Sequence, residues 1–260
     1  MSRVIAIANQ KGGVGKTTTA INLGAAIAVA EERTLVIDLD PQGNASSGLG
    51  LSPANEQQTT IYDVLMSGAD ARAAIRHSVQ FPLLDLMPST RDLVGAEIEL
   101  VGAMSRETIL RRALSPIRAD YDFILLDCPP SLGLLTLNAL TAADSLMIPI
   151  QCEFYALEGL SQLLNTVRLV QRALNPNLEI EGVLLTMFDG RLNLARQVAA
   201  EAKEYFGERV YKTSIPRNVR LAEAPSFGQP ILRYDVLSNG AQSYLSLARE
   251  LMTARGPTAA

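Results

Sequence analysis

The sequence predicts a single α/β domain that spans residues 1–260, with a twisted, mostly parallel sheet covered by helices on both faces. Short apolar runs of strand length alternate with helical patterns along the chain, which is typical of repeated strand–helix units. The runs are apolar nearly throughout, as expected for parallel strands that are buried on both faces. The length, together with an apolar content of 48%, is sufficient for one large core.

Composition restricts the classes of function. A net charge of −4 and an isoelectric point near 5.2 argue against a protein that coats nucleic acid by bulk charge, so any DNA contact has to come from a local basic patch. Cys128 and Cys152 end apolar runs and lack metal-ligand spacing, so we expect reduced, buried, cytosolic thiols. His77 is expected at the surface. No apolar run approaches the ~18 residues of a membrane span, and we expect no signal peptide before so early a first strand.

The first strand and the first helix enclose a glycine-rich turn. Residues 4–8 form a short apolar run, and residues 19–30 follow a helical pattern. Strand, glycine-rich turn and helix are the context of a phosphate-binding loop. Its glycines can adopt positive φ, and its N–H groups would face the phosphates together with the helix N-terminus. The candidate nucleotide-binding residues are Lys11, Gly12, Gly13, Val14, Gly15, Lys16, Thr17 and Thr18.

The turn departs from the strict phosphate-loop pattern. Gln10 stands where the first glycine is required, and Lys11 adds a second lysine. Lys16 is expected to carry the charge that meets the β- and γ-phosphates, and the Thr17 hydroxyl to ligate Mg²⁺. The alternative, a flexible turn with two solvated lysines, is disfavoured by the flanking strand and helix.

Two later strands are expected to end in carboxylates at the same edge of the sheet. Residues 34–38 form a strand, and Asp38 and Asp40 at its end share a face because they are two residues apart. Residues 121–127 form an apolar strand that ends in Asp127, the arrangement that delivers one carboxylate to Mg²⁺ beside a phosphate loop. The alternatives are an acidic pair for solubility and a strand-end carboxylate that caps a loop.

Further strands and helices complete the expected units. Residues 46–56 are a polar loop and carry no assigned chemistry. Strands are expected at residues 83–87, 145–150, 180–187 and 210–213, and helices at 60–66, 71–77, 93–103, 106–114, 156–173, 193–206 and 238–254. A nucleotide is expected at the carboxyl ends of the strands.

Several of these segments resemble the ParA/MinD ATPases. K-G-G-V-G-K-T-T is similar to the deviant phosphate loop of that family, D-L-D-P-Q-G-N to its switch I and C-P-P-S-L-G to its switch II. The resemblance runs from Val4 to about Ala254 and is greatest to the chromosome-partitioning ParA/Soj type. It implies a deviant P-loop NTPase fold and a Mg²⁺-dependent enzyme that hydrolyses ATP. The absence of the base-reading motif of GTPases also favours ATP.

The resemblance also implies roles for individual residues. Lys11 would reach the nucleotide of the other subunit in an ATP-dependent homodimer, and Asp40 would position or activate the attacking water. Pro216 and Asn218 would border the adenine. Arg191 and Arg220 would lie on a face that binds nonspecific double-stranded DNA, within residues 181–235, where eight basic residues stand against seven acidic ones. Solvated helix faces are the alternative explanation of this mild charge excess.

A ParB-type centromere-binding protein is the implied partner, and a cytoplasmic, nucleoid-associated location follows. A MinD-like membrane ATPase at the division site is the main rival, but residues 248–257 lack the basic amphipathic character that lipid binding needs. An iron–sulfur reductase would need cluster cysteines at other positions than Cys128 and Cys152. A bacterial tyrosine kinase would need a C-terminal tyrosine cluster, whereas Tyr244 is the only tyrosine after Tyr234.

Overall fold

The computed structural model describes residues 2–51, 58–153 and 158–253. Within them, six parallel strands form one sheet in the order β3-β2-β4-β1-β5-β6. The strands are β1 (Arg3–Ile7), β2 (Thr34–Asp38), β3 (Leu84–Met87), β4 (Phe123–Asp127), β5 (Ser145–Gln151) and β6 (Glu179–Thr186). The α/β fold expected from the sequence is confirmed.

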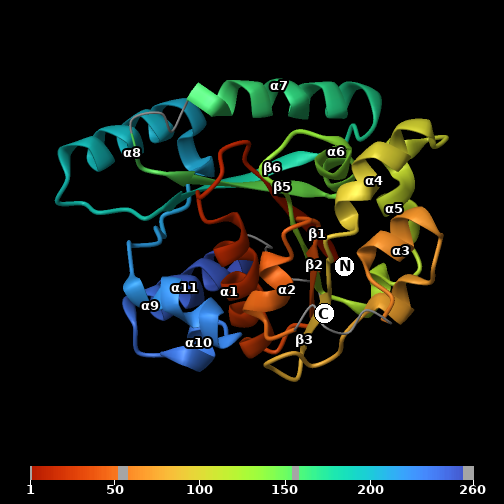
Figure 1. The fold of residues 1–260 in the computed structure, drawn as a ribbon. Helices are drawn as coiled ribbons and strands as arrows, with labels where there is room; N and C mark the ends of the chain where they lie inside the picture. The colour runs from red at the N-terminus through yellow and green to blue at the C-terminus, as the bar shows by residue number, and fades with distance from the viewer. Residues whose placement is uncertain (1, 52–57, 154–157, 254–260) are drawn as a thin grey trace.

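Helices connect the strands and cover both faces of the sheet (Figure 1). The α-helices are α1 (Lys16–Val29), α2 (Asn44–Gly48), α3 (Ile61–Met66), α4 (Leu93–Glu99), α5 (Ile109–Leu114), α6 (Leu134–Ala142), α7 (Glu158–Ala173), α8 (Asn193–Phe206), α9 (Val219–Glu223), α10 (Ile231–Tyr234) and α11 (Asn239–Thr253). Among the described residues, no helix combines the length and apolar character needed to span a bilayer.

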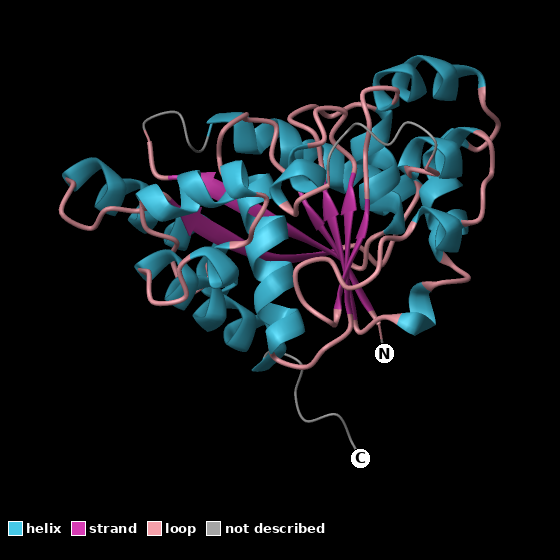
Figure 2. Cartoon of the chain, turned by 60° about the horizontal axis from the view of Figure 1, so that its bottom comes forward, coloured by secondary structure: helices cyan, strands magenta, loops and turns pink. Residues whose placement is uncertain are grey.

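Successive residues of each strand belong to two different cores, one on each side of the sheet. Val4 and Ala6 of β1 pack into the core beneath α3–α8, while Ile5 and Ile7 pack into the core beneath α1 and α11. Such alternation follows from the two-residue period of a strand. Figure 2 shows the strands fanning out between the two layers of helices. Because both faces are covered, the loops at the carboxyl edge remain as the place for a ligand.

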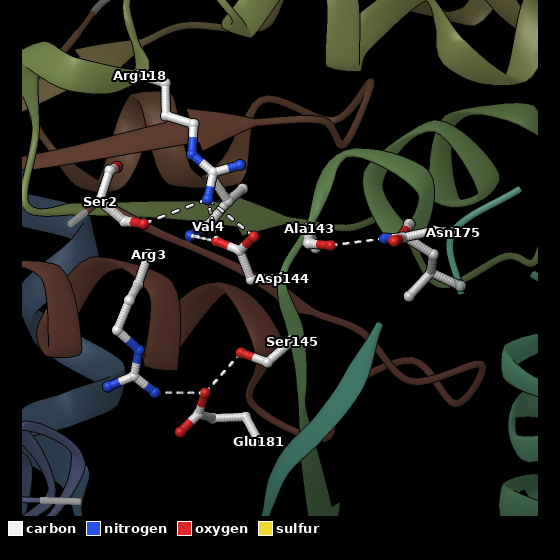
Figure 3. A network of polar contacts seen from close by, with 10 residues as sticks. Ser2, Arg3, Val4, Arg118, Ala143, Asp144, Ser145, Asn175 and Glu181 are labelled. Atoms are coloured by element: carbon white, nitrogen blue, oxygen red, sulfur yellow. Dashed lines mark hydrogen bonds and ion pairs between the residues drawn. The ribbon is translucent and has the colours of Figure 1, made fainter. Parts of the chain in front are cut away.

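Polar side chains tie the opposite, amino edge together (Figure 3). Arg118 donates to both carboxylate oxygens of Asp144, at 2.8 and 2.6 Å, and Asp144 also accepts from the Val4 amide at 2.8 Å. Beside it, the Glu181 carboxylate lies 2.5 Å from both the Arg3 guanidinium and the Ser145 hydroxyl. These contacts join the starts of β1, β5 and β6.

The structure corrects five details of the expected elements. The expected helix at residues 71–77 is a 3-10 helix over Ala71–Ala74 only, and Arg76 forms a bridge with Leu86 of β3. Helix α1 begins at Lys16 rather than at residue 19, because the end of the glycine turn forms its first turn. Helix α2 lies where the start of a loop was expected. Helix α6 was not expected at all, since it is apolar on nearly every side and shows no periodic signal. Helices α9 and α10 also lacked a recognised signal.

The expected strand at residues 210–213 is wrong. Only Val210 forms a bridge, to Val183 of β6. The amides of Lys212 and Thr213 instead donate to the carboxylate of Glu250 in α11, at 2.7 and 3.0 Å. A side chain from a distant helix therefore takes the main-chain donors that a strand would have used. The ends of three other expected segments, at residues 52–56, 156–157 and 254–257, lie outside the described residues.

Cys128 and Cys152 are free and buried, as expected. Burial raises the pKa of the Cys152 thiol to about 11, and that of Cys128 still further. His77 is exposed, and its ring nitrogen lies 2.7 Å from the Asp85 carboxylate. None of these three residues has the environment of a reactive group.

Candidate functional site

The glycine-rich turn lies between β1 and α1 at the carboxyl edge of the sheet. Gly13 and Gly15 have φ of 74° and 87°, in the region that side chains other than glycine rarely adopt. The Thr186 hydroxyl at the end of β6 donates to the Val14 carbonyl at 2.8 Å. Its methyl carbon lies 3.6 Å from the place where a Cβ on Gly15 would stand. The turn is thus fixed against β6, and the positive φ of Gly13 and Gly15 disfavours any other residue at these two positions.

The two lysines of the turn occupy different positions. Lys16 is only 6% exposed, and its Nζ donates to the main-chain carbonyl of Lys11 at 3.0 Å. Burial lowers the pKa of Lys16, against the opposing effects of Asp127, Cys128 and Asp40. The Lys11 side chain is 36% exposed and lies 3.7 Å from Glu153, which also pairs with Arg217 at 3.6 Å. The Lys16 ammonium therefore lies inside the turn, whereas the Lys11 side chain points away from it.

Asp127 is the last residue of β4 and is fully buried. Neither carboxylate oxygen has a hydrogen-bond partner of standard geometry among the described residues. Burial raises the pKa of Asp127 well above its ordinary value, and Asp38 acts in the same direction, while Thr17 and Lys16 oppose the shift. Buried polar atoms are normally satisfied, so two free oxygens indicate a missing partner. A carboxylate beside a threonine hydroxyl fits Mg²⁺, which prefers oxygen ligands.

Asp38 is paired in register with Asp127 on the neighbouring strand. Its oxygens accept hydrogen bonds from the Asp40 amide at 3.1 Å and from the Ser46 amide and hydroxyl at 2.8 and 2.7 Å. Burial raises the pKa of Asp38 to about 6, although these donors favour the charged form. Asp40 accepts from the Gln42 amide at 2.9 Å. Asp38 and Asp127 thus end neighbouring strands at the carboxyl edge of the sheet, and Asp127 and Asp40 lie close enough to Lys16 to oppose the lowering of its pKa by burial.

Pro216 and Asn218 lie in the segment between α8 and α9. The Ile215 amide donates to the Leu185 carbonyl at 2.8 Å, and Pro216 forms a bridge with Phe188. The segment therefore runs beside the strand end that contacts the glycine turn. The Asn218 side chain caps α9 by accepting from the amides of Arg220 and Leu221, at 2.8 and 3.4 Å.

Arg191 lies in the turn between β6 and α8, and Arg220 lies in α9. Both are already paired. The Arg191 side chain is 90% exposed and forms a two-pronged contact with Asp189 at 2.9 and 2.6 Å. Arg220 lies 3.0 Å from Glu223 and 3.6 Å from Asp235. The sequence did not reveal these partners, nor the roles of Ser46, Glu153 and Thr186, because such contacts join residues far apart in the chain or in exposed turns.

Comparison with known proteins identifies the family. A family model described as an AAA domain matches residues 2–180. The chain is 60% identical to sporulation initiation inhibitor protein Soj of Bacillus subtilis, over 96% of this chain and 98% of that protein. It is 58% identical to chromosome partitioning protein ParA of Myxococcus xanthus, over 97% and 88% of the two chains.

Solved structures show the same fold. A Mycobacterium smegmatis structure named cobyrinic acid a,c-diamide synthase, with bound ADP and magnesium, is 38% identical with a TM-score of 0.84, over 97% of this chain and 94% of that one. The cell division ATPase MinD of Pyrococcus furiosus is 28% identical with a TM-score of 0.80, over 98% and 100% of the two chains. Identity is much higher to the relatives named Soj and ParA. This chain therefore belongs to the ParA/Soj family of chromosome-partitioning ATPases.

Proposed function

We propose that ATP and Mg²⁺ convert this ATPase into a homodimer that binds nonspecific double-stranded DNA, and that hydrolysis, stimulated by a ParB-type centromere-binding protein, releases it. The observation that carries the proposal is the separation of the two lysines. Lys16 fills the interior of the glycine turn, whereas the Lys11 ammonium faces out of it toward Glu153. A second lysine directed away from its own cradle is available to the nucleotide of another subunit.

Different residues of one subunit contact the phosphates, the Mg²⁺ ion, the attacking water and the adenine of ATP. The main-chain amides of the glycine turn and the first turn of α1 hold the phosphates, and the Lys16 ammonium adds a full positive charge. Thr17 and Asp127 hold Mg²⁺, which when bound neutralises charge on the phosphate oxygens. Asp40 orients the attacking water. Pro216 and Asn218 border the adenine. The cradle residues are Lys11, Gly12, Gly13, Val14, Gly15, Lys16, Thr17 and Thr18.

Dimerisation requires Lys11 to leave Glu153. The two side chains are 36% and 48% exposed and their charged atoms are 3.7 Å apart. Exposed ion pairs of this kind contribute about 0–1 kcal/mol, so the exchange costs little. A phosphate chain offers several negative oxygens in a site that the second subunit would shield from water, where the attraction is larger. Lys11 is therefore suited to a contact that forms only when ATP is present.

DNA binding would use the face that carries Arg191 and Arg220. Both pair with neighbouring carboxylates through exposed contacts, which phosphates can replace at small cost. Contacts to phosphates carry no base information, which suits binding along the whole nucleoid in the cytoplasm. Two arginines on each of two subunits would give four such contacts.

The test is the molar mass of the protein by light scattering with ATP, with ADP and without nucleotide. We expect a dimer only with ATP, a monomer for Lys11→Ala under all three conditions, and a wild-type response for Lys212→Ala, which removes a lysine far from the turn in sequence. ATP binding by Lys11→Ala is measured in parallel by calorimetry. An ATP-bound Lys11→Ala variant that dimerises normally would refute the role of Lys11 across the interface.

A further inference from the structure

Asp38 is the one carboxylate of the site whose two oxygens both accept hydrogen bonds from the described chain. Oδ1 accepts from the Asp40 amide at 3.1 Å, and Oδ2 accepts from the Ser46 amide at 2.8 Å and hydroxyl at 2.7 Å. The side chain is fully buried. Asp127, its partner on the next strand, is equally buried and has no such donors. The Asp38 carboxylate is therefore saturated by donors of the chain, whereas the Asp127 carboxylate is left for a ligand.

The donors to Asp38 are the two ends of a short loop. Asp40 stands at its start and Ser46 lies in α2 at its end, with a left-handed turn at Gly43 between them, where φ is 63°. The Gly43 amide donates to the Asp40 carbonyl at 2.9 Å. The Asp38 carboxylate thus holds the two ends of the loop together and fixes the position of the Asp40 main chain.

Ser46 extends the connection to a second strand. Its hydroxyl donates to Asp38 and accepts from the Ser89 amide at 3.0 Å, just beyond the end of β3. All three residues are buried. The chain of contacts from Asp38 through Ser46 to Ser89 therefore anchors the loop to β2 and β3, the two strands at one edge of the sheet.

We propose that Asp38 is a positioning residue for ATP hydrolysis, which holds Asp40 in place through Ser46 and the main chain without touching the nucleotide. This inference rests on the proposed role of Asp40. A displacement of ~1 Å in a reacting group can cost about 10²-fold in rate, so the ties that locate Asp40 matter as much as its carboxylate. An asparagine at position 38 would turn an NH₂ group toward N–H and O–H donors, and would lose part of the network.

The test compares Asp38→Asn and Ser46→Ala with Ser47→Ala. Ser47 is the adjacent, exposed serine, and its hydroxyl donates to the nearby Asn44 carbonyl at 3.3 Å. We expect kcat for ATP hydrolysis to fall about 10²-fold in Asp38→Asn and about 10-fold in Ser46→Ala, since the lost hydrogen bond involves a charged group. Ser47→Ala keeps the wild-type kcat. The Kd for a fluorescent ATP analogue stays within about twofold of wild type in all three.

Asp40→Ala distinguishes positioning from a direct role. If Asp38 acts only through Asp40, adding Asp38→Asn to Asp40→Ala gives no further loss of kcat. Losses that multiply would overturn the proposal, as would wild-type rates in Ser46→Ala and Asp38→Asn when Asp40→Ala is slow. A fast Asp40→Ala enzyme would instead remove the proposed role of Asp40, and the positioning role with it. Ser46→Ala deletes a single hydroxyl, so it provides a folded variant even if Asp38→Asn is unstable.

Discussion

The ammonium of Lys16 lies 3.0 Å from the main-chain carbonyl oxygen of Lys11 and donates a hydrogen bond to it. One lysine of the glycine turn thus binds the backbone of the other. The bond places the charge of Lys16 inside the cradle and leaves the Lys11 side chain to point outward, where it meets Glu153. The strict phosphate-loop pattern has one lysine, at the position of Lys16. The turn of this chain has a second, Lys11, and the hydrogen bond keeps the two positive charges apart.

Lys16→Ala is expected to weaken ATP binding by about 10²-fold or more, because truncating one member of a buried charge pair typically costs 2–5 kcal/mol. Isothermal titration calorimetry measures the effect, with Lys212→Ala as the control for loss of one positive charge. ATP affinity within a fewfold of wild type would show that Lys16 does not meet the phosphates.

Asp127→Asn is expected to raise the Mg²⁺ concentration needed for half-maximal hydrolysis by about 10-fold or more, since a neutral amide is a poor ligand for a hard cation. It should also raise the melting temperature of the nucleotide-free protein. The folded state raises the pKa of Asp127, so at neutral pH the charged form destabilises the fold, and the amide removes that cost. Each ~1 kcal/mol gained shifts the melting temperature by about 2–4 °C.

Asp85→Asn is the matched control for Asp127→Asn. Asp85 lies in β3, but its oxygens accept from the Ser78 amide at 2.8 Å and the Tyr121 hydroxyl at 2.7 Å. Its replacement should lower the melting temperature and leave the Mg²⁺ requirement unchanged. A lower melting temperature in Asp127→Asn with an unchanged Mg²⁺ requirement would contradict the assignment of the metal site.

Arg191→Ala and Arg220→Ala are each expected to reduce the salt dependence of DNA binding with ATP present. Four phosphate contacts predict a slope of log K against log salt of about −3.6, and each substitution removes two contacts from the dimer, which brings the slope to about −1.8. A salt titration with a fluorescent nonspecific duplex measures it. Arg112→Ala, in α5 at the other end of the sheet from α9 (Figure 1), is the control.

Asp189→Asn tests the same DNA-binding face by a change that should strengthen DNA binding rather than weaken it. Arg191 lowers the pKa of Asp189 to about 2 through its two-pronged contact, so Asp189 is charged at neutral pH and competes with DNA phosphates for that arginine. The substitution should tighten DNA binding. If the arginine variants keep the wild-type slope and Asp189→Asn has no effect, the DNA face lies elsewhere, with Arg196, Lys203 and Arg233 as the next candidates.

Glu181→Ala is expected to destabilise the fold by about 1–3 kcal/mol, because it leaves Arg3 and the Ser145 hydroxyl without a partly buried acceptor. Hydrolysis at temperatures where the variant is folded should match wild type, since this network lies at the starts of β1 and β5, whereas the glycine turn follows the end of β1. Urea denaturation supplies the free energy of unfolding. Asp120→Ala, which breaks the exposed pair with Arg72 at 2.8 Å, should cost less than about 1 kcal/mol.

Much of the fold follows from local patterns in the sequence. Strand β2 has the expected bounds, and β1 differs by one residue at each end, because short and nearly continuous apolar runs indicate strands that are buried on both faces. The glycine turn and the strand-end carboxylates were also predictable, since their order along the chain places them at one edge. Helix α6 escaped prediction for the opposite reason, as full burial removes the periodic contrast between its faces.

The finer details of the site depend on contacts that no local pattern carries. Ser46 lay in an expected loop, and it folds into α2 while its amide and hydroxyl are held by Asp38. The spacing of the sequence placed Asp38 and Asp40 on one face and did not distinguish their tasks, whereas in the structure both oxygens of Asp38 are occupied by loop donors. The pairing of Arg191 with Asp189 lies in an exposed turn, where no hydrophobic pattern of the sequence indicates which charged side chains meet.

The most direct test of the account is the affinity of the wild-type protein for a fluorescent nonspecific duplex with ATP and Mg²⁺, with ADP and Mg²⁺, and without nucleotide. Fluorescence anisotropy should show binding with ATP alone, and Lys11→Ala should abolish it although that variant still binds ATP. Binding that is equal under all three conditions, or an ATP-dependent association with anionic liposomes in place of DNA, would contradict the proposal that the ATP-bound dimer is the DNA-binding form.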